Sequence, residues 1–238
     1  CLLGLESVLA GEMKRMGAQN ITAEDGRVSF EGTFEDAAAA NLRLRTAERV
    51  QIVVAEFEAR SYEELFQGTL AAPWEEFIGR KDAFPVKGRT VRSQLYSMSD
   101  CQSIIKKAVV ERLKLKYRIP WFEETGSLYQ IQFSIMKNVV SLLIDTSGRG
   151  LHKRGYRPAA NAAPLKETLA ASLCNISRLR EYHTLYDPMC GSGTILVEGA
   201  LMARNMAPGL HRHFVSERWS QAPAEVWQQE RERAKAAE

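Results

Sequence analysis

The residues best suited to chemistry lie in one glycine-rich stretch, Leu185–Thr194 (LYDPMCGSGT). The pattern predicts a strand end, a tight turn and the start of a helix through Ile195–Leu201. Gly191 and Gly193 carry no side chain that would hold a ligand away from the backbone. The first free N–H groups of the helix would then face that ligand. The stretch therefore predicts a site for a nucleotide-like cofactor, against the plainer alternative of a strand-to-helix turn with two glycines.

Two common nucleotide motifs do not fit this stretch. A dinucleotide fingerprint needs a third glycine where Leu196 stands, and a phosphate loop needs a lysine soon after Gly193. A carboxylate at Asp187 would repel phosphate but would favour a cation or hydroxyl groups. S-adenosylmethionine offers an amino group, a sulfonium and a ribose, so it suits the stretch better than a phosphate-led cofactor.

The string Asp-Pro-x-Cys-Gly-Ser-Gly-Thr resembles the first cofactor motif of class I S-adenosylmethionine-dependent methyltransferases, in the branch that methylates exocyclic amines of nucleobases. The resemblance implies S-adenosylmethionine as the cofactor. It implies these cofactor-binding residues: Asp187, Pro188, Cys190, Gly191, Ser192, Gly193 and Thr194. Within the motif Cys190 is expected to fill the loop rather than to act as a nucleophile.

Composition places few other limits on the chain. Its 238 residues allow one or two domains by length, and 45% hydrophobic residues is typical of a globular protein. The four cysteines do not have zinc-ligand spacing, so no metal site is expected. Neither a signal sequence nor a membrane-length apolar run occurs, which makes a cytoplasmic location the default.

Positive charge is concentrated in residues 80–118, where eleven Lys and Arg stand against three Asp and Glu. A basic stretch on a nearly neutral chain favours a polyanionic partner, although it could also be an ordinary solvated face. Beside a nucleobase-type motif we interpret it as an RNA-binding surface. The candidate RNA-binding residues are Lys87, Arg89, Arg92, Lys106, Lys107 and Lys114 here, with Lys153, Arg154 and Arg157 further on.

Residues 1–60 are expected to form a ferredoxin-like domain. Helical spacing covers Leu3–Met16 and Phe34–Leu44, and Asp25-Gly26 predicts a hairpin turn between them. Arg49–Ala59 then predicts a strand. Helix, hairpin, helix and strand make most of a split β-α-β-β-α-β unit, whose first strand would precede Cys1.

Residues 61–150 resemble a THUMP domain, the RNA-binding module of several RNA-modifying enzymes. The resemblance rests on the basic strand that begins Phe84-Pro85-Val86-Lys87-Gly88-Arg89 and on Ser99-Asp100 ahead of the amphipathic helix Ile104–Tyr117. Tyr62–Thr69 predicts a further helix. A hairpin is expected from Tyr129–Ile135 and Val139–Asp145.

Residues 151–238 are expected to be the N-terminal part of a class I, Rossmann-like methyltransferase domain. The string HKRGYR at 152–157 and the string APLKETLA at 163–170 resemble the entry to that domain. Pro164 would lie near the first turn of a helix and is a further candidate cofactor-binding residue. The first-turn residues of that helix would either touch the methionine part of the cofactor or simply pack under the sheet. With the glycine loop, these strings resemble bacterial THUMP-containing guanine-N2 methyltransferases of 23S ribosomal RNA, also described as N6-adenine-specific DNA methylases. The fold class is thus α/β, with an α+β N-terminal part.

The sequence lacks the Asn/Asp-Pro-Pro-Tyr/Phe motif that, in this family, holds the target amine and stacks on the flipped base. The catalytic residues are therefore unknown. Three hypotheses follow: methylation of guanine N2 in ribosomal RNA, methylation of adenine N6 in DNA, or an RNA-binding segment without catalysis. The target nucleotide and the oligomeric state stay open.

Overall fold

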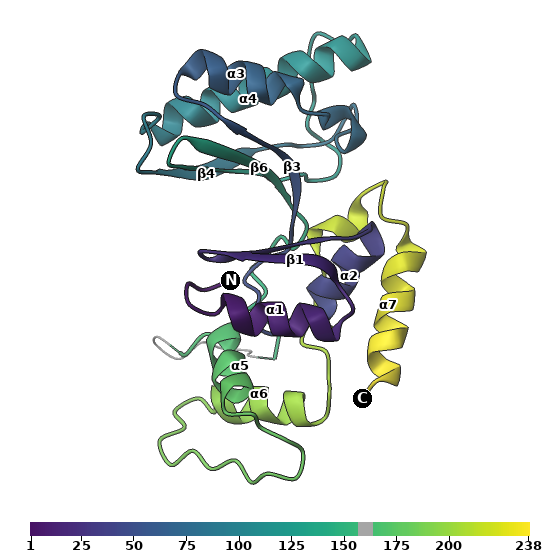
Figure 1. The fold of residues 1–238 in the computed structure, drawn as a ribbon. Helices are drawn as coiled ribbons and strands as arrows, with labels where there is room; N and C mark the ends of the chain where they lie inside the picture. The colour runs from purple at the N-terminus through teal and green to yellow at the C-terminus, as the bar shows by residue number, and fades with distance from the viewer. Residues whose placement is uncertain (157–163) are drawn as a thin grey trace. The chain divides into compact units, whose positions relative to one another are not determined.

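The computed structural model describes residues 1–156 and 164–238 as a mixed α/β chain (Figure 1). Two compact units are present. Unit 1 comprises Cys1–Val50, Arg149–Glu217 and Ala222–Glu238, and unit 2 comprises Gln51–Gly148 and Arg218–Gln221. Both units are therefore built from segments that are distant in the sequence.

The N-terminal part of unit 1 follows the predicted order of helix, hairpin and helix. Helix α1 (Glu6–Arg15) leads to strands β1 (Gln19–Glu24) and β2 (Arg27–Glu31), and α2 (Phe34–Arg43) follows. The turn between the strands holds Gly26 at φ 73°, a conformation that glycine adopts without strain. Thr33 caps α2 by accepting the backbone N–H of Asp36, and the Asp36 carboxylate accepts from Thr33 in return.

The regular elements in the rest of unit 1 are helices. Helix α5 (Glu167–Ile176) packs against α6 (Thr194–Ala203), and α7 (Ala224–Ala236) packs against α2 (Figure 1). A short 3₁₀ turn, η2, spans Val215–Arg218. Pro164 lies just ahead of Lys166, the N-cap of α5, and therefore stands immediately before the first turn of the helix.

Unit 2 is a four-stranded sheet in the order β3-β6-β5-β4, with α3 and α4 over one face (Figure 1). Its strands are β3 (Gln51–Glu58), β4 (Val86–Val91), β5 (Ile131–Met136) and β6 (Val139–Asp145). Its helices are α3 (Tyr62–Ala71), the 3₁₀ turn η1 (Trp74–Glu76) and α4 (Met98–Tyr117). Strands β4 and β5 are parallel and joined through α4, whereas β5-β6 and β6-β3 are antiparallel.

The prediction that Arg49–Ala59 completes the ferredoxin-like unit is wrong. The strand in this region, β3, pairs with β6 along its length, from Gln51 opposite Asp145 to Glu58 opposite Val139. Strands β1 and β2 instead form a separate two-stranded sheet. The hydrogen bonds of β3 therefore belong to unit 2.

The predicted strand before the glycine loop is absent as well. Among the described residues, none pairs with Leu185–Asp187, which the structure leaves outside any sheet. A parallel strand is defined by its neighbour, so an extended segment without a partner does not form one.

Candidate functional site

The glycine loop forms a tight turn that leads directly into α6. Gly193 N donates to Cys190 O at 2.8 Å, and Met189 N donates to Asp187 Oδ1 at 3.2 Å. Gly191 and Gly193 have φ of 54° and 70°, in the left-handed region that disfavours other residues. The glycines are therefore needed for the shape of the turn.

The space in front of the loop is open. A Cβ built on Gly191 or Gly193 would meet no atom within 4 Å. Helix α6 begins at Thr194 without a side-chain cap from its N-cap residue, Gly193. The loop can accept a polar group against its backbone, and the chemistry of its donors fits S-adenosylmethionine.

The predicted cofactor residues differ in exposure. Asp187 and Gly193 are half-buried, Thr194 is buried, and its hydroxyl lies 3.1 Å from Ser192 Oγ. Pro188, Cys190, Gly191 and Ser192 are exposed, and Pro164 is half-buried before α5. The sequence had led us to expect that the Cys190 side chain fills the loop. In the structure, Cys190 is exposed.

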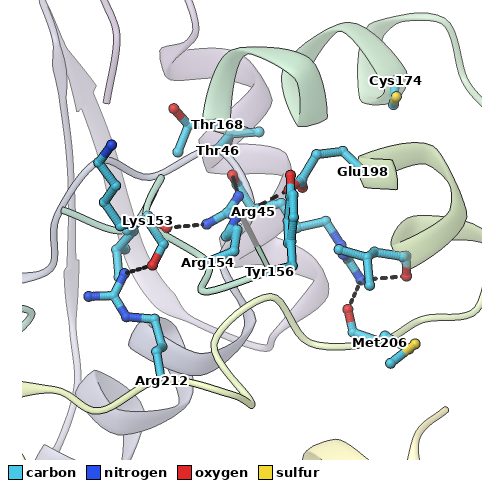
Figure 2. Close-up of polar contacts among 12 residues, drawn as sticks. Arg45, Thr46, Lys153, Arg154, Tyr156, Thr168, Cys174, Glu198, Met206 and Arg212 are labelled. Atoms are coloured by element: carbon cyan, nitrogen blue, oxygen red, sulfur yellow. Dashed lines mark hydrogen bonds and ion pairs between the residues drawn. The ribbon is translucent and has the colours of Figure 1, made fainter. Parts of the chain in front are cut away.

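Behind the loop, a fully buried carboxylate anchors α6 (Figure 2). Glu198 is 0% exposed and Arg154 only 3%. Arg154 Nε lies 3.5 Å from Glu198 Oε1, and the Tyr156 hydroxyl donates to the same oxygen at 2.9 Å. Because Glu198 is four residues after Thr194, this ion pair fixes the first turns of α6.

The opposite end of α6 is held by Arg45, which follows α2 (Figure 2). Its Nη2 donates to Met206 O at 2.8 Å and to Leu201 O at 3.4 Å. Its backbone N–H donates to Glu12 Oε2 at 3.0 Å. Burial raises the pKa of Glu12 and lowers the pKa of Arg45. Residues from the N-terminal segment of unit 1 thus support the helix of the loop.

A smaller polar cluster lies where residues 149–156 meet Glu48. His152 Nδ1 lies 3.5 Å and Lys166 Nζ 3.3 Å from Glu48 Oε2, and Thr168 donates to Oε1 of the same carboxylate. Burial lowers the pKa of His152. The cluster joins Glu48 to the start of α5, so His152 has a structural contact here.

Sequence reasoning missed this supporting network. Glu198 stands in the otherwise apolar helix Thr194–Ala203 (TILVEGALMA), and a lone carboxylate in such a helix is a signal for a buried partner. Arg45 and Glu12 gave no comparable signal, because they occur in ordinary charged surroundings.

The candidate RNA-binding residues fall into distinct groups. Lys87, Arg89, Arg92, Lys107 and Lys153 are exposed, and no ion pair to them is found among residues 1–156 and 164–238.

Three other candidates are engaged elsewhere. Lys106 Nζ donates to Glu124 Oε1 at 2.6 Å and to Phe84 O at 3.1 Å, and Lys114 Nζ lies 3.0 Å from Glu111. Arg154 is enclosed by protein, so the prediction that it contacts RNA is wrong. Arg157 lies outside the described residues.

Two searches of the described part of the chain gave negative results. No group of three or more His, Cys, Asp or Glu is arranged to hold a metal ion. None of the helices in that part has the length and apolar character needed to cross a bilayer.

Three protein-family models match the chain in succession. They are the RlmL ferredoxin-like domain at residues 1–51, the THUMP domain at 59–145, and the RMKL-like methyltransferase domain at 154–238. The order agrees with the three parts expected from the sequence. The exposed glycine loop lies in the third match.

Curated relatives are similar over nearly the whole chain. "Putative RNA methyltransferase YpsC" of Bacillus subtilis is 44% identical over 96% of this chain and 60% of its own length. "Ribosomal RNA large subunit methyltransferase K/L" of Magnetococcus marinus is 36% identical over 94% of this chain and 32% of its own length. The chain thus spans about three fifths or less of these relatives.

Solved structures share the fold. A crystal structure described as a predicted N6-adenine-specific DNA methylase from Listeria monocytogenes matches with a TM-score of 0.96 and 47% identity, over 100% of this chain and 62% of that one. SMU.472, described as a putative methyltransferase complexed with SAH, matches with a TM-score of 0.94 and 38% identity, over 100% and 63%.

Proposed function

We propose that this chain captures RNA and holds S-adenosylmethionine for methyl transfer to a base. Its successive matches to the RlmL ferredoxin-like, THUMP and RMKL-like methyltransferase domains support the proposal. The observation that carries the proposal is the glycine loop: two glycines at positive φ, open space before them and an uncapped helix start. The geometry of the loop is consistent with the chemistry that the matching methyltransferase domain suggests.

The residues that would hold the cofactor are those of the loop. Asp187 would face the hydroxyl or amino groups, while the turn Gly191–Thr194 would let the ligand come close to the backbone. When bound, S-adenosylmethionine supplies an electrophilic methyl group on its sulfonium and leaves as S-adenosylhomocysteine. The relative SMU.472 was solved with SAH, which supports this choice.

RNA is the favoured substrate class. The K/L relative is named for ribosomal RNA, and Lys87, Arg89, Arg92 and Lys107 present exposed cations on unit 2. Such cations bind phosphates without reading sequence. We extend the proposal to guanine N2 of 23S ribosomal RNA, on the resemblance stated above and that relative's name.

The DNA alternative rests on the description of the Listeria structure as a DNA methylase. A comparison of labelled methyl transfer to ribosomal RNA and to duplex DNA, using the chain and a longer version of it, separates the two. The proposal expects transfer to RNA lacking the modification. Transfer to DNA alone would overturn it.

Cofactor binding by the chain itself is tested with Gly193→Val. A β-branched residue at φ 70° is strained, and its side chain would enter the space proposed for the ligand. We expect calorimetric affinity for S-adenosylmethionine to fall at least about tenfold, because one lost backbone contact is worth about 1.4 kcal/mol or more.

Gly26→Val is the matched control. Gly26 also has positive φ, at 73°, and open space around it, but it lies in the β1–β2 turn. It should lose comparable stability and keep its cofactor affinity. If the wild-type chain shows no affinity for the cofactor, the remaining alternative of an RNA-binding segment without cofactor gains support.

A further inference from the structure

One of the four tryptophans is placed unlike the others. Trp121 is 78% exposed, whereas Trp74, Trp219 and Trp227 are 0%, 3% and 4% exposed. Exposing an indole to water is unfavourable because the ring is large and mostly apolar, so a largely exposed tryptophan suggests a functional role. None of the residues assigned above to cofactor or RNA accounts for it.

The exposure of Trp121 is built into a fixed loop between α4 and β5. The next residue, Phe122, is buried and meets Phe84 edge-on, with ring centroids 5.6 Å apart. The Glu124 carboxylate accepts from Lys106 Nζ at 2.6 Å and from Phe84 N at 3.1 Å. These contacts hold Phe122 and Glu124 inward and leave Trp121 outward.

The part of this loop around Gly126 also packs closely against the rest of unit 2. Gly126 N donates to Lys81 O at 2.6 Å, and a Cβ on Gly126 would lie only 2.9 Å from that oxygen. The loop therefore lies against residues 81–82. This contact places the backbone of Lys81 beside Gly126, in the loop that carries Trp121.

Positive charge surrounds the end of α4 that carries the loop. Arg118 is the C-cap residue of α4, and Lys116 lies in its last turn. Arg80, Asp82 and Glu75 are all close enough to Tyr117 to influence its pKa. The Asp82 carboxylate accepts from backbone N–H groups and the Glu75 carboxylate from Arg112, so both are already engaged. With Lys81, four exposed cations gather here against the exposed carboxylates of Glu123 and Glu76. The surface favours an anionic partner.

We propose that Trp121 is a stacking platform for an unpaired RNA base, with the neighbouring phosphates held by Arg118 and Lys116. The inference rests on the proposed RNA substrate and adds a specific contact to it. Unpaired bases stack on exposed aromatic side chains while cations follow the backbone.

A protein partner fits this surface less well. Protein interfaces bury a larger apolar core, whereas the exposed large apolar side chains nearest to Trp121 in the sequence are Leu115 and Leu128, at 75% and 41% exposed. An isolated ring bordered by cations suits a base and its phosphates better.

Acrylamide quenching of tryptophan fluorescence reports on this residue almost alone, because the other three indoles emit but are buried and shielded from the quencher. Acrylamide, a neutral quencher, should quench Trp121 in the free chain. A short unstructured RNA oligomer at saturating concentration should protect it. Protection that appears on raising protein concentration without RNA would instead identify a protein partner and overturn the inference.

Binding affinities then distinguish the contribution of base stacking from the contribution of phosphate contacts. Trp121→Ala should weaken binding of the oligomer at least about fivefold, the lower end of what one stacked base contributes, and Trp121→Phe should restore most of it. An abasic oligomer with the same phosphates should bind wild type and both variants equally.

The outcomes distinguish the two proposals. If the wild-type chain binds RNA while Trp121 stays quenchable and Trp121→Ala binds as tightly, the stacking platform is wrong and RNA capture stands. If the wild-type chain binds no RNA, both are wrong. Equal circular dichroism melts of the variants exclude unfolding as the cause.

Discussion

At the scale of single residues, Glu198 shows how a buried charge can serve a binding loop. Its carboxylate is paired with Arg154 and accepts from Tyr156; Glu198 and Arg154 are buried, and Tyr156 is half-buried. Removing one member of such a pair leaves the other charge buried without compensation. The pair is therefore a sensitive point of the structure.

We expect Glu198→Ala to lower the free energy of unfolding by about 3–5 kcal/mol, the usual result of breaking a buried pair. Glu198→Gln should lose less, because its amide oxygen can still accept from Tyr156. Urea denaturation measures both. Glu225→Ala, at an exposed position in α7, is the control and should change little.

Tyr129 provides a pH-dependent test. Its ring is buried and stacks on Trp219 with centroids 4.4 Å apart, and its hydroxyl donates to Gln221 at 2.6 Å. Burial raises the pKa of Tyr129 from 10.0 to about 12.

In that window the unfolded chain releases the phenolic proton while the folded chain keeps it, so stability falls as pH rises from 10.0 to about 12. The loss attributable to Tyr129 should approach about 2 kcal/mol at the upper end. Denaturation curves of wild type and Tyr129→Phe across this range measure it. Parallel loss in both proteins would show that Tyr129 is not responsible.

At the scale of elements, local signals predicted helices and hairpins well. Thr33 and Ser61 cap α2 and α3 with acidic residues three positions on, and Asp25-Gly26 forms the turn of β1 and β2. Helix α4 buries Ile105, Ala108, Val109 and Leu113 as its spacing predicts. These features depend on neighbours in the sequence.

Strand pairing could not be predicted in the same way. The residues of β3 specify an extended strand but not its partner, which is β6, some ninety residues away. The segment before the glycine loop has strand-like residues but no partner among the described ones. Pairing is a tertiary property, so the pattern identifies a strand without its sheet.

Gly88 in β4 tests a close approach between strands. A Cβ there would lie 2.3 Å from the Phe133 carbonyl oxygen and 2.4 Å from the Phe133 ring. Gly88→Ala should therefore destabilise unit 2, by about 1–3 kcal/mol. Thermal unfolding followed by circular dichroism measures the change.

Gly11→Ala in α1 is the matched control. A Cβ there would meet only the end of the Arg15 side chain, at 3.6 Å. Alanine in a helix interior should raise stability slightly, by about 0.5–1 kcal/mol. If Gly88→Ala is as stable as Gly11→Ala, the close packing of β4 on β5 is wrong.

At the scale of the whole molecule, charge is distributed unevenly although the net charge is only +3. The sequence identified the basic stretch, and the structure divides it. Lys87, Arg89 and Arg92 are exposed, whereas Lys106 and Arg154 are held in internal contacts. Sequence alone could not separate them, because partners such as Glu124 and Glu198 are distant in the chain.

Salt dependence measures how many exposed cations meet phosphate. We expect replacement of Lys87, Arg89 and Arg92 together by glutamine to make the salt dependence of single-stranded RNA binding shallower. The magnitude of the negative slope of log affinity against log salt should fall by about 2, at about 0.7 per lost contact. Glutamine at Lys14, Arg204 and Lys235, all exposed on unit 1, is the control. Equal slopes in both triple variants would contradict the assignment.

The pairing of β3 with β6 also has a consequence for synthesis on the ribosome. When residues 51–58 emerge, their hydrogen-bonding partner, residues 139–145, has not yet been made. Residues 1–50 likewise cannot complete unit 1 until residues 149–217 and 222–238 have been made. Strand edges that wait for a late partner are prone to pair wrongly. Vectorial folding of this chain is therefore delayed until most of it has been translated.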